Sequence, residues 1–356
     1  MRQPIQSSAN LRLRRIGAAA LWMVLMLAAP AIAATPIDLS DVAAGQLNAR
    51  TQALARAAAA VVGVRSTATP DASSIATLGR EREGSGVLID ADGLVLTIGY
   101  LILEADHVDL VLDTERLLPA RVVAYDQATG FGLLQALAPV RRPAARFGDS
   151  AAITADEPLM IASGGEDADL SLARLVSRRR FAGYWEYAIA GALFTAPPRG
   201  DHSGAGLFNA AGELLGIGSL VVSDALGPDQ PRMKGNMFVP IDLLKPILGE
   251  LRTQGSARSS RRAWLGLNCT EQEGQVRVAR VTPESPAERA GLLAGDRILR
   301  LDGAEVNGLE SLYATLWRDA RAEREVTLEI VRDGQPQVLK ALTLDRMQAL
   351  RKPQGI

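Results

Sequence analysis

The chain has 356 residues, of which 47% are hydrophobic and 22% charged, and its formal net charge is -1. This length exceeds one ordinary core, because single domains cluster near roughly 100 to 200 residues. The charge excludes a whole-surface attraction to nucleic acid or anionic lipid. The 33 glycines and 18 prolines favour a turn-rich, strand-rich globular fold.

Residues 1–34 have the pattern of a secretory leader. An uncharged stretch, 16–27, follows Arg12, Arg14 and Arg15, and Ala31-Ile32-Ala33 has the small-x-small form that signal peptidases accept. We expect this leader to be cleaved and the protein to be periplasmic or otherwise exported. The alternative is an uncleaved membrane anchor, because residues 16–34 are nearly long enough to span a bilayer.

Residues 35–60 are alanine-rich and weakly helical, which predicts an N-terminal arm ahead of a first domain over residues 61–252. Short apolar runs bounded by turn residues predict strands in this domain, and an Asp-Gly turn at Gly93 predicts a hairpin. Many short strands without long alternating helices indicate a barrel or a sandwich. The predicted strands are Val61–Val64, Gly86–Ile89, Leu94–Thr97, Val108–Leu112, Arg121–Tyr125 and Leu214–Val222.

Helical spacing of leucines predicts an amphipathic helix over Asp242–Arg252, with Pro246 in its first turn, which would close the first domain. The polar, basic segment 253–262 is typical of a flexible linker. A second domain is predicted over 263–345, followed by a tail, 346–356. Cys269 is the only cysteine, so no intramolecular disulfide can form, and we expect it to be a buried small apolar residue.

The second domain resembles a PDZ domain over nearly its whole length. The resemblance implies that the loop Trp264-Leu265-Gly266-Leu267 presents N–H groups to a peptide's terminal carboxylate while the adjoining strand edge pairs with the peptide. Leu312 and Leu316, on a helix from about 309 to 318, would form the other wall; the alternative is that these leucines belong only to the core. The matching segments are Trp264–Leu267, Val278–Val281, Ser285-Pro286-Ala287, Ala290-Gly291-Leu292, Gly295–Leu299, Asp302-Gly303 and Val331–Gly334.

The first domain is similar to the protease domain of the HtrA/Deg family, through motifs whose order and spacing also match. The fold implied is mainly β: a chymotrypsin-like, trypsin-like double β-barrel followed by one PDZ domain. The matching segments are Gly84–Ile89, Gly93–Thr97, Asp126–Leu134, Ser203–Asn209, Gly212–Ile217 and Phe238-Val239-Pro240.

The resemblance implies a triad that retains only Ser203. Serine proteases need a histidine that takes the serine proton and an aspartate that holds the histidine. The family's histidine position falls on Tyr100 and its aspartate position on Gly130. A phenol with an ordinary pKa of about 10 is a poor general base at neutral pH. The family's glycine two residues before the serine falls on Asp201, whose charge is unfavourable near a developing oxyanion; the alternative is an insertion in the loop after Gly200.

The chain has two histidines, which are the candidates for a substitute base. His202 is adjacent to Ser203 in sequence, an arrangement that usually directs the two side chains apart. His107 lies seven residues beyond Tyr100 and is expected at the surface. No metal-binding spacing and no glycine-rich phosphate loop occur, so the sequence predicts neither a metal site nor a cofactor.

We therefore expect a proteolytically inactive envelope protein whose PDZ groove binds C-terminal or unfolded peptide segments of other envelope proteins, and no binding of nucleic acid. One alternative is an active serine endopeptidase of envelope protein quality control that uses an unconventional base. Another is a regulatory subunit, because members of the family are commonly trimers and this chain could assemble as a homo-trimer or with an active homologue.

Overall fold

The computed structural model describes residues 39–113 and 116–350. Contacts divide the chain into two units, Met1–Ala43 and Ala44–Ile356. The predicted leader, 1–34, lies outside the described residues, and helix α1 (Leu39–Ala59) falls within the segment predicted as an N-terminal arm. None of the helices in the described part of the chain is both long and apolar enough for a membrane span.

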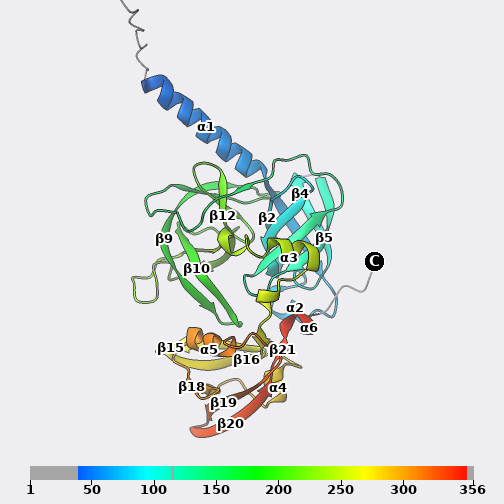
Figure 1. Cartoon of the computed structure of the whole chain (residues 1–356), viewed down its shortest axis with the longest axis vertical. Coiled ribbons are helices and arrows are strands. Elements are labelled where there is room, and N and C mark those ends of the chain that lie inside the picture. Colours follow the sequence, from blue (N-terminus) through cyan, green and yellow to red (C-terminus); the bar gives the residue numbers. More distant parts are fainter. Residues whose placement is uncertain (1–38, 114–115, 351–356) are drawn as a thin grey trace, which may run out of the picture. The chain divides into compact units, whose positions relative to one another are not determined.

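Strands β1 to β6 form a closed barrel in the order β1-β2-β3-β6-β5-β4, drawn in blue to cyan in Figure 1. The predicted hairpin joins β2 to β3, where Gly93 adopts a φ of +87° that favours glycine. The strands are β1 Val61–Ala68, β2 Glu81–Leu88, β3 Leu94–Ile98, β4 Ala105–Asp113, β5 Arg116–Tyr125 and β6 Phe131–Ala136, with helix α2 (Ile75–Leu78) after β1 and a 3-10 helix, Gly99–Leu101, after β3.

A second barrel follows in the chain, and its long strands β9 and β10 run side by side in Figure 1. Strand β11 pairs with both β8 and β12, so the order β11-β8-β9-β10-β13-β12 closes on itself. The predicted double β-barrel is confirmed. The strands are β7 Arg146–Phe147, which pairs in parallel with β12, β8 Leu159–Ala162, β9 Leu170–Gly183, β10 Tyr187–Ala196, β11 Gly206–Phe208, β12 Glu213–Val222 and β13 Gly235–Pro240.

The helix predicted over Asp242–Arg252 is wrong in its first half. The chain forms a 3-10 helix, Ile241–Leu243, and then turns, before helix α3 runs over Leu248–Gln254. Pro246 explains the difference, because it has no N–H to donate to the carbonyl group four residues earlier. The segment predicted as a linker contains a 3-10 helix, Arg258–Ser260, and the side chain of Ala257 is buried.

The second domain has a sheet in the order β15-β16-β17-β19-β20, in which β15 is an edge strand. Helix α4 begins at a serine cap, since the Ser285 side chain accepts a hydrogen bond from the Glu288 N–H. The elements are β14 Ala263–Trp264, β15 Leu267–Gln272, β16 Gln275–Val281, α4 Pro286–Arg289, β17 Arg297–Leu301, β18 Ala304–Glu305, α5 Leu309–Leu316, β19 Glu325–Arg332, β20 Gln335–Leu342, β21 Leu344–Asp345 and α6 Arg346–Ala349.

The barrels and the second domain have separate hydrophobic cores. Phe131, Phe194 and Phe208 are fully buried among the barrel residues, whereas Leu301 and Ile330 are buried in the second domain. Cys269 is also buried in the second core, and burial raises the pKa of its thiol. It is therefore a packing residue and not a reactive one.

Candidate functional site

Ser203 lies in the turn that precedes strand β11 and is held there by the neighbouring barrel. Its carbonyl oxygen accepts a hydrogen bond of 2.8 Å from the Ser85 N–H. Gly204 follows with a φ of +75°, and a Cβ at this position would lie 1.9 Å from the Ser85 carbonyl oxygen. Only glycine fits so close to another backbone, which explains the Ser-Gly pair in the motif.

Tyr100 faces Ser203. The Tyr100 Oη lies 2.8 Å from the Ser203 Oγ and 2.9 Å from the carbonyl oxygen of Ser219. A phenol has one proton, so both contacts form together when Tyr100 donates to the Ser219 carbonyl and accepts from the Ser203 hydroxyl. The serine proton is then directed at a neutral phenol.

Burial raises the pKa of Tyr100 to about 12, although the hydrogen bond with Ser203 lowers it. At neutral pH only about one molecule in 10⁵ would carry a phenolate at this position. A general base works best when its pKa lies near the working pH. A neutral Tyr100 therefore contacts the Ser203 hydroxyl but is a poor acceptor for its proton at neutral pH.

Gly130 provides no carboxylate behind Tyr100, and the side chain of Tyr187 packs against this glycine. The residue has a φ of +78°, and a Cβ there would lie 2.8 Å from the hydroxyl of Tyr187. That hydroxyl donates to the Thr129 carbonyl oxygen at 2.8 Å. The nearby Asp126 carboxylate accepts from the N–H and the hydroxyl of Thr129. An aspartate at position 130 would need both a strained backbone and the displacement of Tyr187.

Asp201 lies beside the serine as a paired anion. Its carboxylate accepts hydrogen bonds from Arg199 and from the Ser163 hydroxyl. The bond from Arg199 is the main reason that the pKa of Asp201 is lowered to about 2. Asp201 lines a cavity of about 220 Å³ that Ser203 also lines, together with other acidic side chains, Glu83, Glu166 and Asp167. Arg65 also lines this cavity and forms ion pairs with Glu83 and Glu166, so these two carboxylates, like Asp201, are paired. A carboxylate does not stabilise a developing oxyanion.

Both histidines are hydrogen-bonded to groups other than Ser203. The His202 Nδ1 lies 3.0 Å from the carbonyl oxygen of Gly200, and burial lowers the pKa of its ring. The His107 Nε2 lies 2.9 Å from Asp109 in an exposed part of β4. Within residues 39–113 and 116–350, neither imidazole forms a hydrogen bond with the Ser203 hydroxyl.

The predicted peptide-binding loop donates its N–H groups to a carboxylate from the first domain. The Glu186 carboxylate accepts from the N–H groups of Leu265 at 3.0 Å, Gly266 at 2.8 Å and Leu267 at 2.7 Å. Glu186 lies in the turn of the β9–β10 hairpin (Tyr184, Trp185 and Glu186), which we call the hairpin tip. The sequence carries no signal for this contact, because the loop lies about 80 residues further along the chain.

The hairpin tip also pairs with the strand edge next to the loop. The Cys269 N–H donates to the Tyr184 carbonyl oxygen at 2.7 Å. On the other side of the groove, the Tyr313 hydroxyl on α5 donates to the Gly183 carbonyl oxygen at 2.7 Å and accepts from the Glu186 N–H at 3.1 Å. The predicted wall residues Leu312 and Leu316, like Leu265 and Leu267, are buried in the second core.

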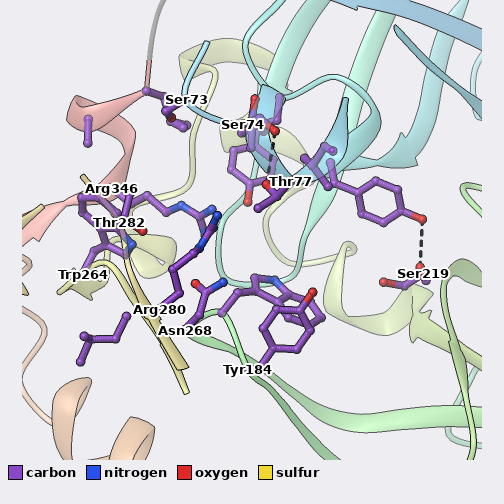
Figure 2. Close-up of a pocket in the computed structure, with 18 of the residues that line it drawn as sticks. Ser73, Ser74, Thr77, Tyr184, Ser219, Trp264, Asn268, Arg280, Thr282 and Arg346 are labelled. Carbon is purple, nitrogen blue, oxygen red and sulfur yellow. Dashed lines mark hydrogen bonds between the residues drawn. The ribbon is translucent and has the colours of Figure 1, made fainter. Parts of the chain in front are cut away.

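A cavity of about 350 Å³ extends from Tyr100, His202 and Ser219 to the second domain. Figure 2 shows side chains of both domains around it, with Ser219 on one side and Trp264 on the other. Tyr100 lines this cavity, whereas Ser203 lines the smaller one described above. In the described part of the chain, no group of three or more His, Cys, Asp or Glu side chains could hold a metal ion.

Comparisons with known proteins agree with both domains. The family model of the trypsin-like peptidase domain matches residues 84–217, and that of the PDZ domain matches residues 263–343. A solved structure described as the HtrA-type protease AlgW with a decapeptide is 24% identical, has a TM-score of 0.50, and covers 85% of this chain and 99% of that chain. The chain is therefore similar to HtrA-type proteases in having a trypsin-like peptidase domain followed by a PDZ domain.

HtrA/Deg relatives include two proteins named probable periplasmic serine endoprotease DegP-like. The one from Marinomonas sp. (strain MWYL1) is 26% identical over 279 residues, which cover 75% of this chain and 57% of the relative. The one from Pseudomonas putida (strain W619) is 28% identical over 280 residues, which cover 73% of this chain and 56% of the relative. The chain therefore spans about half the length of the curated relatives it matches.

Proposed function

We propose that this HtrA/Deg chain is an exported protein of the bacterial envelope that binds peptides and does not cleave them. The observation that carries the proposal is the Tyr100 Oη, 2.8 Å from the Ser203 Oγ. Two further features support export: the leader-like residues 1–34, and the relatives named as periplasmic endoproteases.

The chemistry of the serine supports the absence of proteolysis. A serine alcohol becomes an effective nucleophile when an adjacent base takes its proton. Tyr100 has a pKa of about 12, and Gly130 offers no carboxylate that could lower the barrier to charging a base. Removing the base of a triad typically slows catalysis by about a million-fold. The remaining hydroxyl of Ser203 is then a structural hydrogen-bonding group.

The chemistry of the second domain supports peptide binding. Its loop N–H groups have the geometry to hold a carboxylate, since they hold that of Glu186 with three hydrogen bonds. Strand β15 is an edge strand, and β-augmentation by an extended peptide needs such an edge. We propose that the ligands are C-terminal segments of other envelope proteins with an apolar last side chain, because the loop residues Leu265 and Leu267 share one apolar cluster with Leu312 and Leu316 of α5.

Two measurements test this function. The full chain, expressed with its leader and purified, is incubated with unfolded casein, and the products are analysed by mass spectrometry. We expect no fragments beyond those released by a Ser203→Ala variant; fragments that require Ser203 would instead establish an active endopeptidase, the activity in its relatives' names. Fractionation of the native envelope then tests the remaining alternative, because a regulatory subunit would co-purify with an active homologue.

A further inference from the structure

The N–H groups of the PDZ loop have an occupant within the chain. All three bonds of the loop end on one carboxylate, that of Glu186, which is buried. Each N–H donates one strong hydrogen bond, so the loop cannot hold the carboxylate of Glu186 and that of a peptide at the same time. The two carboxylates are chemically equivalent and compete for one site.

The hairpin tip also takes the place that an extended peptide backbone needs. Strand β15 donates the Cys269 N–H to the carbonyl group of Tyr184, two residues before Glu186. A peptide that pairs with the edge of β15 would use the same N–H group. Tyr313 closes the opposite side with its hydrogen bonds to Gly183 and Glu186. The hairpin tip therefore occupies the place of a bound peptide's backbone as well as that of its terminal carboxylate.

The docked hairpin tip carries backbone strain and a desolvated carboxylate. Glu186 has a φ of +55°, a left-handed conformation that is unfavourable for a residue with a Cβ. Its carboxylate is removed from water, and full hydrogen bonding only partly offsets that loss. A peptide carboxylate at a flexible chain end could make the same bonds without the backbone strain. Displacement of the hairpin tip is therefore feasible for a ligand of moderate affinity.

We propose that the hairpin tip is a built-in competitor that keeps the PDZ groove closed until a peptide with a free terminal carboxylate displaces Glu186. The proposal rests on the peptide-binding function proposed above and adds its regulation. The groove is then selective for ligands that bind well enough to open it, because the apparent affinity falls in proportion to the open fraction.

The test compares wild type with Glu186→Ala by fluorescence anisotropy. The probe is a fluorescein-labelled decapeptide that ends in Tyr-Trp-Leu with a free carboxylate, which repeats the residues before Glu186 and places an apolar side chain at the end. We expect the variant to bind the probe at least about tenfold more tightly than wild type. The same peptide with a C-terminal amide should bind weakly to both proteins.

Glu273→Ala is the matched control. Glu273 is also a glutamate in a hairpin turn with positive φ, 51°, but it is exposed and far from the loop in the sheet register. The Glu273→Ala variant should bind the probe with the affinity of wild type. Tyr313→Phe, which keeps the ring and loses both hydroxyl bonds to the hairpin, is a second variant that should also tighten binding.

Hydrogen exchange separates the outcomes. In Glu186→Ala the amides of residues 265–269 should exchange faster than in wild type, while those of β19 remain unchanged. Equal probe affinities in wild type, Glu186→Ala and Tyr313→Phe would overturn the proposal and leave peptide binding intact. If the loop amides of Glu186→Ala exchange faster but none of the proteins binds the probe, both the proposal and the peptide-binding function would be overturned.

Discussion

The hydroxyl of Tyr187 lies 2.8 Å from the point where a side chain at Gly130 would begin. The position at which the HtrA/Deg pattern predicts an aspartate is therefore filled by a neighbouring ring. Tyr187 stacks on Trp185 with ring centroids 5.3 Å apart, which holds the phenol in place. We therefore expect that a single substitution at Gly130 would not place a carboxylate behind Tyr100 without displacing Tyr187.

Gly130→Asp should destabilise the first domain by about 2 kcal/mol or more, because the new side chain must accept a positive φ and push Tyr187 away. Gly191→Asp is the control, since Gly191 also has a positive φ, 64°, with no atom within 4 Å of its would-be Cβ. It should cost about 1 kcal/mol. Urea unfolding followed by hydrogen exchange of β6 measures the change in free energy of unfolding for both variants. Equal destabilisation by the two substitutions would mean that the contact with Tyr187 adds nothing to the cost.

The hydroxyls of Tyr100 and Ser203 should be coupled energetically. Tyr100→Phe leaves the Ser219 carbonyl and the Ser203 hydroxyl without this partner, so it should destabilise the domain by about 1 kcal/mol. Combined with Ser203→Ala in a double-mutant cycle, it should give a coupling of about 0.5 to 1.5 kcal/mol. Strictly additive effects would mean that the two oxygens do not share a hydrogen bond in solution.

Peptide binding should strengthen as the pH rises. Burial raises the pKa of Glu186 to about 7, while the loop N–H groups and Arg346 lower it. A raised pKa means that docking of the hairpin tip is most stable below the ordinary pKa of 4.5 and weakens as the pH rises through about 7. The terminal carboxylate of the free peptide stays ionised over this range. We expect it to stay ionised in the groove as well, because a chain end is less removed from water than the buried Glu186.

Between about pH 5 and 7 the affinity for the decapeptide should therefore increase by up to about tenfold per pH unit. The other titratable groups that interact with Glu186 are Arg346, Cys269 and Tyr313, and burial raises the pKa of the Cys269 thiol and the Tyr313 phenol. Glu186→Gln should flatten the profile. A profile that stays the same in this variant would assign the pH dependence to another group.

The ion pair of Asp201 with Arg199 should make the free energy of unfolding of the first domain depend on pH in the acid range. Its pKa is lowered to about 2, so the ionised form adds stability above the ordinary pKa of 3.8 that is lost as the pH falls to about 2. Because the carboxylate is partly exposed, the effect is screened by solvent. Asp201→Asn should flatten the pH dependence of the free energy of unfolding between about pH 2 and 4. The control Asp156→Asn, at an exposed position, should leave it unchanged. Identical curves for both variants would argue against the ion pair.

The sequence predicts part of the two-domain fold from apolar runs bounded by turn residues, as at Gly93 between β2 and β3, whereas a strand such as β9, which contains three consecutive arginines, has no such pattern. It also predicts that the phenol of Tyr100 and the hydroxyl of Ser203 are relevant to one site, which depends on motif spacing. It fails at Asp242–Arg252, where the missing N–H of Pro246 outweighs the helical spacing of leucines.

The contact between Glu186 and the PDZ loop could not be predicted from the sequence. Residues Tyr184 to Glu186 carry no motif and yield no prediction, whereas their partners Leu265, Gly266 and Leu267 are predicted to form a loop that binds an external peptide. The contact depends on tertiary packing between two domains, which leaves no spacing pattern in the chain. The same is true of Tyr187 beside Gly130.

The reactivity of Ser203 is the most direct test of the account. The full chain is treated at neutral pH with a fluorophosphonate, which bonds covalently to activated serine hydroxyls, and the site is located by peptide mass spectrometry. With Tyr100 as its hydrogen-bonding partner, Ser203 should remain unlabelled, as in a Ser203→Ala control. Labelling of Ser203 that is absent from the control would contradict the account and identify an active nucleophile.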